Sequence, residues 1–161
     1  MNPKLGDILS EAQIITDLRA ASRWEAIDEL VNKLVETGGI KAEHHDGINA
    51  AVRKRELSMT TGIGFGIGIP HASTDLIHKA VAAFGRSKQP INFDALDGQP
   101  VNLVILFLIP QNQFQRHLLT VAEISKLLRN ASVRQALEQA PDAGTILQII
   151  RGPQSSSPEL L

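Results

Sequence analysis

The sequence predicts an α/β domain of three layers, in which helices cover both faces of a central sheet. Residues 101–109, VNLVILFLI, are almost all apolar and end at Pro110, as is typical of a strand buried on both faces. Helical patterns precede and follow this run in the sequence. A strand that is covered on both faces and mixed with helices requires a helical layer on each side of the sheet.

Two helices are expected before the buried strand. Ser22 and Glu25 match a capping box, apolar residues at helical spacing follow them, and Gly38 is a stop signal, so a helix is predicted between them. A second helix is expected over residues 42–57, with a basic end that suits the helix dipole. This helix brings Arg55 beside a glycine-rich segment.

Shorter elements complete the predicted domain. They are a strand at 79–84, a turn at Asp97-Gly98, and helices at 114–128, 133–140 and 145–150. We expect residues 1–152 to form a single domain and residues 153–161 to form a disordered tail.

Composition excludes several classes of function. Sixteen basic and seventeen acidic side chains leave a net charge of -1, so the chain has no general attraction for nucleic acid or anionic membrane. The absence of cysteine excludes disulfides and thiolate chemistry. The longest apolar run is too short to cross a bilayer, and the first residues lack a signal-peptide pattern. We therefore expect a cytoplasmic protein that neither binds nucleic acid nor inserts into a membrane.

Residues 60–73, TTGIGFGIGIPHAS, are the most informative segment. Four glycines alternate with four apolar residues, which predicts one extended strand with a bare face, leading through Pro70 into a stiff turn at His71. The bare face indicates either tight packing against a neighbouring helix or the close approach of a partner. The glycine spacing matches neither a Rossmann fingerprint nor a P-loop, so we expect no cofactor.

Five side chains are candidates for a reactive site. His71 could be a nucleophile or a general base, or it could cap a turn. His117 heads an apolar helical stripe and could be its partner or a core histidine. Arg55 could bind an anion at His71 or be a solvated charge at a helix end. Thr60 and Thr61 could add hydroxyl hydrogen bonds to the same anion.

Other polar residues carry less weight. His44 and His45 are adjacent and diverge on a helix, and no HExxH or three-ligand spacing is present, so we expect no metal site. Ser73 lacks a GxSxG elbow and is a poor candidate for a hydrolase nucleophile.

Taken together, these residues resemble the EIIA component of the bacterial phosphoenolpyruvate-dependent sugar phosphotransferase system. The resemblance is to the fructose/mannitol type, including its nitrogen-regulatory branch, and covers nearly the whole chain. The residues that carry it are Arg55-Glu56, Thr60-Thr61-Gly62-Ile63-Gly64, Gly68-Ile69-Pro70-His71-Ala72, Phe93-Asp94, Gln99-Pro100-Val101 and His117-Leu118. Gly68 departs from the family, which commonly has alanine there.

The resemblance implies a mixed sheet between helices and a phosphorylated histidine. By position, His71 would accept a phosphoryl group, through Nε2, from a histidine phosphocarrier of the HPr type. His117 would hydrogen-bond the active ring or the phosphoryl group, and Arg55 would pair with the phosphate. Thr61 and backbone N–H groups could stabilise charge on the phosphoryl oxygens.

Two functions follow from the resemblance. The first is a phosphoryl carrier that acts in nitrogen or metabolic regulation, through contact with a transporter or a kinase that depends on its phosphorylation state. The alternative is a sugar-specific EIIA that passes the phosphoryl group to an EIIB domain. The segment INFDALDGQPV and the lack of an attached EIIB, membrane or HPr-like domain favour the regulatory branch.

Overall fold

The computed structural model describes residues 4–152, and the tail expected at residues 153–161 lies outside them. Six strands in the described part form one sheet with the order β1-β5-β6-β3-β2, and β4 also pairs with β6. They are β1 (Ile14–Ile15), β2 (Gly62–Gly64), β3 (Ile67–Gly68), β4 (His71–Thr74), β5 (Val81–Ile91) and β6 (Val101–Pro110). The sheet is mixed, because β6 runs antiparallel to β5 and parallel to β3 and β4.

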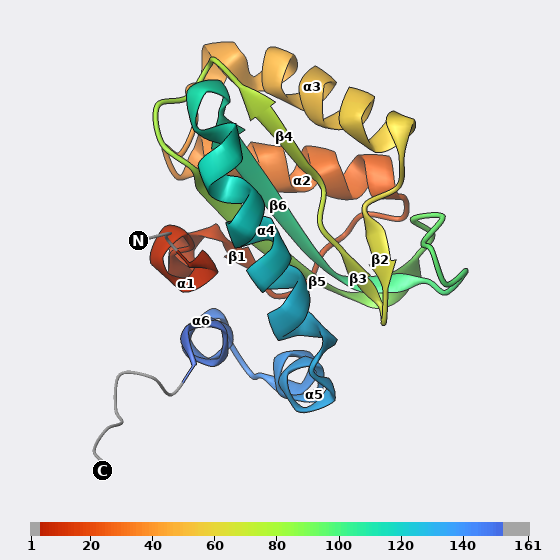
Figure 1. The fold of residues 1–161 in the computed structure, drawn as a ribbon. Helices are drawn as coiled ribbons and strands as arrows, with labels where there is room; N and C mark the ends of the chain where they lie inside the picture. The colour runs from red at the N-terminus through yellow and green to blue at the C-terminus, as the bar shows by residue number, and fades with distance from the viewer. Residues whose placement is uncertain (1–3, 153–161) are drawn as a thin grey trace.

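Helices cover both faces of this sheet. They are α1 (Leu5–Ile8), α2 (Arg23–Glu36), α3 (His45–Ser58), α4 (Phe114–Arg129), α5 (Ala131–Gln139) and α6 (Ala143–Arg151). Short 3-10 turns are η1 (Glu11–Gln13), η2 (Ala42–His44) and η3 (Gln111–Gln113). Figure 1 shows α4 crossing one face of the sheet, with α2 and α3 on the other. The predicted three-layer α/β fold is confirmed.

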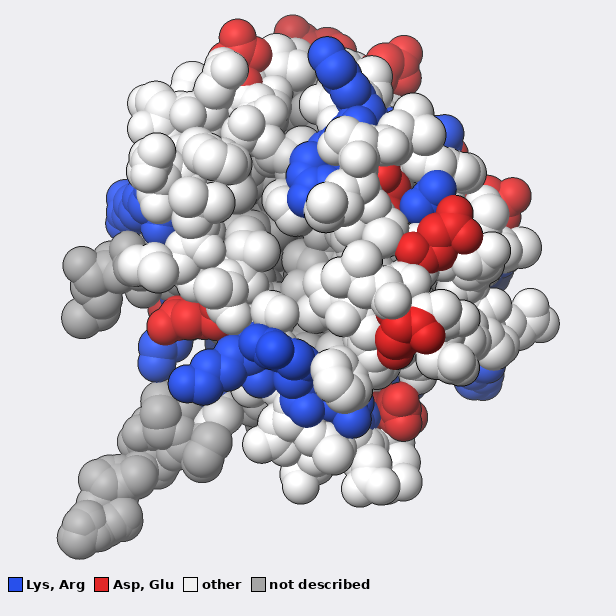
Figure 2. Space-filling model, turned by 45° about the vertical axis from the view of Figure 1, so that its right-hand side comes forward, with Lys and Arg blue, Asp and Glu red and all other residues white. Residues whose placement is uncertain are grey.

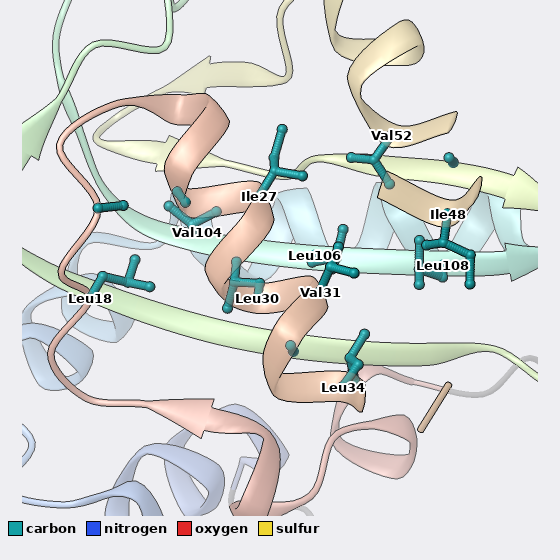
Figure 3. Close-up of a cluster of buried hydrophobic side chains, with 14 of the residues drawn as sticks. Leu18, Ile27, Leu30, Val31, Leu34, Ile48, Val52, Val104, Leu106 and Leu108 are labelled. Carbon is teal, nitrogen blue, oxygen red and sulfur yellow. The ribbon is translucent and has the colours of Figure 1, made fainter. Parts of the chain in front are cut away.

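Strand β6 is buried on both faces, as its apolar sequence predicts. Val104, Leu106 and Leu108 pack against α2 and α3, as Figure 3 shows. The alternate side chains, among them Ile105 and Phe107, pack into a second core on the α4 face. A fully buried side chain of this size stabilises the fold by about 1.5–3 kcal/mol, so each of these apolar side chains contributes to the stability of the fold.

The first predicted helix begins and ends as its signals indicate. The Ser22 hydroxyl accepts a hydrogen bond from the Glu25 N–H at 3.1 Å, and Gly38 has a φ of 80°, in the left-handed region. The Glu25 carboxylate accepts from Ala21 N–H at 2.8 Å, one residue before the position that a capping box uses. The second helix starts later than expected, because residues 42–44 form the 3-10 turn η2.

The glycine-rich segment is a hairpin, so the prediction of one extended strand was wrong. Strands β2 and β3 are antiparallel, with Gly62 opposite Gly68. The chain reverses because Gly64, Phe65 and Gly66 have φ values of 104°, 61° and 79°, which an extended strand does not allow.

The glycines meet neighbouring parts of the same chain. A Cβ atom added to Gly62 would lie 2.8 Å from Cβ of Ala95, and one added to Gly68 would lie 2.9 Å from Cε2 of Phe93. Of the two interpretations of the bare face, tight packing is therefore the one the structure supports at these positions. The neighbour is the segment containing Phe93 and Ala95, which precedes β6, and not a helix as we had expected.

His71 also differs from its predicted setting. It is the first residue of β4 and lies opposite Phe107 of the parallel strand β6, whereas the sequence predicted a turn at the end of a strand. Pro70 separates β3 from β4, and both strands pair with β6. The backbone of His71 is thus held by the sheet.

Candidate active site

A cavity of about 860 Å³ opens beside β4. Its walls come from the C-terminal half of α3, from β2 and β4, and from α4. Figure 2 shows a face of the molecule that is hollowed near its middle, with uncharged atoms over much of the rim and basic groups above and below. His71, Arg55, Thr60 and Thr61 all line the cavity, so four of the five candidate residues share one site.

The ring of His71 is fixed through one nitrogen. Its Nδ1 lies 2.7 Å from the carbonyl oxygen of Ile69. Because a carbonyl oxygen only accepts hydrogen bonds, Nδ1 carries the hydrogen and the lone pair of a neutral ring resides on Nε2. The lone pair of Nε2 is therefore the one through which a neutral His71 ring could act as a nucleophile.

Burial lowers the pKa of His71 below its ordinary value. The hydrogen bond to Ile69 raises this pKa, Arg55 lowers it, and Glu56 raises it, but the cost of desolvating a cation is the largest effect. The ring is consequently neutral near pH 7, which is the form that can attack an electrophile.

Two cations line the cavity with His71. Arg55 donates a hydrogen bond to the carbonyl oxygen of Met59 at 2.9 Å, just beyond the end of α3. Lys54 is a second cation, which no pattern in the sequence indicated as a site residue. The basic triplet at residues 53–55 was the available signal, but three adjacent helical residues point in different directions, so the sequence could not show which of them face the site.

Thr60 and Thr61 use their hydroxyl groups within the protein. Thr60 Oγ1 donates to the carbonyl oxygen of Phe93. Thr61 Oγ1 donates to the buried carboxylate of Glu56, which also accepts from the Thr61 N–H at 3.0 Å and pairs with Arg23 at 3.3 Å. Both threonines fix the walls of the cavity in this state, and neither hydroxyl hydrogen is free for an anion.

His117 lies outside this cavity. Its side chain is buried in α4, with Nε2 3.3 Å from Oε1 of Gln113 and Nδ1 3.4 Å from Oγ1 of Thr120. The ring meets Phe107 edge-on at 5.7 Å between centroids. Burial, and secondarily the charge of Arg116, lowers its pKa. Within residues 4–152 the structure shows no bond between His117 and His71, although both neighbour Phe107.

Large apolar side chains surround His71 and are exposed to solvent. Met59 is 63% and Leu96 is 72% exposed, and Phe114 and Leu118 of α4 are also exposed. All four line the cavity. An apolar rim around a polar centre is typical of a surface that another protein covers.

The described residues contain few features of other site classes. No group of three or more histidine, cysteine, aspartate or glutamate side chains in residues 4–152 could hold a metal ion. The histidines at 44 and 45 instead contact their neighbours Glu43 and Asp46. No helix in the same range is long and apolar enough to span a membrane.

Comparison with known families identifies the family of the chain. The family described as "Phosphoenolpyruvate-dependent sugar phosphotransferase system, EIIA 2" matches residues 7–152. The chain belongs to this family. It is therefore a component of a phosphotransferase system, and the resemblance noted in the sequence is confirmed.

Relatives of the chain fall into both branches of the family. It is 31% identical over 151 residues to a nitrogen regulatory protein of Bradyrhizobium diazoefficiens, covering 94% of this chain and 97% of the relative. It is 36% identical over 130 residues to a fructose-specific EIIA component of Haloferax volcanii, covering 81% and 83%. The nitrogen regulatory protein IIA-Ntr of Neisseria meningitidis superposes with a TM-score of 0.83 at 28% identity, covering 91% of this chain and 98% of that structure.

Proposed function

We propose that this EIIA protein carries a phosphoryl group on Nε2 of His71 and that its phosphorylation state controls a regulatory contact. The observation that supports this most is the position of His71 in the cavity. Its Nδ1 is anchored to Ile69, its Nε2 is left to react, and the cations of Arg55 and Lys54 share the same walls. Cations are needed there because a phosphorylated side chain adds nearly two negative charges.

The transfer step needs no proton acceptor. The Nε2 lone pair of His71 attacks the phosphorus of a phosphohistidine on the donor, and a bond between Nε2 and phosphorus forms as the donor's bond between nitrogen and phosphorus breaks. The electron pair returns to the donor ring, which keeps a proton on its other nitrogen and leaves as neutral imidazole. His71 keeps its Nδ1 proton and becomes cationic, and the Ile69 carbonyl stabilises that charge.

The donor is a histidine phosphocarrier protein of the HPr type. The apolar rim formed by Met59, Leu96, Phe114 and Leu118 provides a surface that such a protein can cover. Excluding water from the cavity strengthens the attraction between Arg55 and the transferring group. The protein contributes positioning and charge stabilisation, which is most of what phosphoryl transfer requires.

Labelling tests this function directly. Incubation with phosphoenolpyruvate, enzyme I and an HPr-type protein should add one phosphoryl group to the intact protein, labile in acid and stable in base. The His71→Ala variant should remain unlabelled under the same conditions. Equal labelling of the variant and the wild type would exclude His71 as the acceptor.

A sugar-specific role is the second candidate, because the relative from Haloferax volcanii is named a fructose-specific EIIA component. In that role the phosphoryl group passes from His71 to an EIIB domain. Rapid transfer from the labelled protein to a fructose-type EIIB would favour sugar uptake. A stable complex of the unlabelled protein with a transporter or kinase, lost on phosphorylation, would favour regulation.

A further inference from the structure

Hydroxyl groups on the cavity wall differ in whether they are free to bind a ligand. Five line the cavity, on Ser58, Thr60, Thr61, Ser73 and Ser125. The first three donate hydrogen bonds within the protein, Ser58 to the carbonyl oxygen of Arg55 at 2.7 Å. Among residues 4–152, neither Ser73 nor Ser125 has a partner for its hydroxyl group.

We infer that Ser73 supplies the side-chain hydroxyl that binds the phosphoryl group on His71, an inference that rests on the proposed function. His71 and Ser73 are two residues apart in β4, so their side chains lie on the same face of the strand. Both are half-buried, and both line the cavity. Their partners in β6, Phe107 and Ile109, belong to the core on the α4 face, which agrees with that placement.

The backbone of β4 adds donors at the same place. In the described part of the chain β4 pairs with β6 alone, and the Phe107 N–H donates to the Pro70 carbonyl oxygen at 3.0 Å. Successive residues of a parallel strand turn their N–H groups to opposite edges, so those of His71 and Ser73 point away from β6. Ser73 can therefore offer both its hydroxyl and its N–H to an anion beside His71.

Charge makes this hydrogen bond effective. A hydroxyl that donates to an anionic phosphoryl oxygen forms a short, charge-assisted bond. In the transition state the charge is spread over the three equatorial oxygens, and a donor already positioned beside them requires no rearrangement. Ser73 takes the role that the sequence suggested for Thr60 and Thr61, whose hydroxyls hold Phe93 and Glu56 instead.

Ser125 provides the contrast within the same cavity. It lies on α4, a separate element on the facing wall, whereas Ser73 shares a strand with His71. Two strand residues span only about 7 Å, which fixes the distance between His71 and Ser73 whatever the width of the cavity. Ser132, on α5 and away from the cavity, is a matched control for the loss of a serine hydroxyl.

The test measures the rate of phosphoryl transfer from a phosphorylated HPr-type protein in single turnovers, by quenching and intact mass. We expect Ser73→Ala to slow transfer by about 10-fold to 100-fold, as for removal of a donor to a charged group. Ser73→Thr, which keeps the hydroxyl and suits a strand, should recover most of the rate. Ser132→Ala should match the wild type, and melting temperatures should show that all variants are folded.

Each contrary result has a distinct meaning. A wild-type rate for Ser73→Ala overturns the inference, and so does slow transfer in Ser125→Ala while Ser73→Ala is normal. Equal slowing by Ser73→Ala and Ser73→Thr would show that packing, and not the hydroxyl, sets the rate. If the wild type takes up no phosphoryl group, or if His71→Ala is labelled, the proposed function fails before the serine variants are compared.

Discussion

His71 and His117 both neighbour Phe107, and burial lowers the pKa of both rings, yet their surroundings differ. His71 has one nitrogen anchored and lies in a cavity with two cations. His117 has a partner at each nitrogen and is almost completely buried. Burial alone therefore does not distinguish the two histidines. Of the two, His71 combines an anchored nitrogen with a cavity and two cations, which is the arrangement that the proposed phosphoryl transfer requires.

The largest effect is expected for Arg55, the arginine that lines the same cavity as His71. Arg55→Ala should slow phosphoryl transfer by about 10-fold to 100-fold, because one cation beside the equatorial oxygens is lost. The free energy of unfolding should change by less than about 1 kcal/mol, since the side chain makes one exposed hydrogen bond. Arg55→Lys separates charge from the bidentate geometry of arginine. A wild-type rate for Arg55→Ala would leave Arg55 as a solvated charge at a helix end.

His117→Ala tests the buried histidine of this comparison. Loss of a buried ring that packs on Phe107 should lower the free energy of unfolding by about 1–3 kcal/mol, as is common for buried positions with hydrogen bonds. His71 should still accept a phosphoryl group, with transfer impaired less than in Arg55→Ala. Denaturant unfolding and single-turnover transfer measure the two quantities. If stability is unchanged and transfer is lost, His117 acts on the phosphoryl group, and the contrast between the two histidines does not hold.

Gly68→Ala tests how tightly β3, the strand before His71, packs against Phe93. The added Cβ would lie 2.9 Å from the ring of Phe93, so we expect a loss of about 1–3 kcal/mol from overpacking. Gly144→Ala is the matched control, because its Cβ would meet its nearest neighbour at 3.4 Å in a helix. Thermal or denaturant unfolding distinguishes them. Equal stability of Gly68→Ala and the wild type would show that Phe93 can move, and that the alanine common in the family fits here.

The smallest effect concerns pH. Both histidines have a pKa below the ordinary value of about 6.5, so between that value and the folded pKa the unfolded chain binds more protons. The free energy of unfolding should therefore fall as pH falls below about 6.5, and this loss should be absent above it. Denaturant titrations between about pH 5 and pH 8 measure the slope. His71→Ala and His117→Ala should each reduce it, and an unchanged slope in both variants would contradict the shifts.

Much of the fold could be predicted because its signals are local. The apolar run of β6, the spacing and N-cap of α2, and the helical spacing of α4 each lie within one short stretch of sequence. The glycine hairpin was missed because alternation of glycine and apolar residues matches a strand, while reversal of the chain depends on three left-handed residues, one of them Phe65. Lys54 and Ser73 were missed as site residues because their sequence neighbours do not show which side chains face a cavity.

The sequence by itself determined which groups are available for chemistry: one histidine after a proline, a second histidine on a helix, a basic helix end, and no cysteine. Only the tertiary structure decided which of these groups meet. Glu56 pairs with Arg23 and Thr60 donates to Phe93, each across 33 residues of sequence. The second bond uses the hydroxyl of Thr60, and the first fixes the carboxylate to which the hydroxyl of Thr61 donates. Contacts of this kind depend on how strands and helices pack, and a local pattern carries no information about them. The same packing leaves Nε2 of His71 and the hydroxyl of Ser73 without a partner in the described part of the chain.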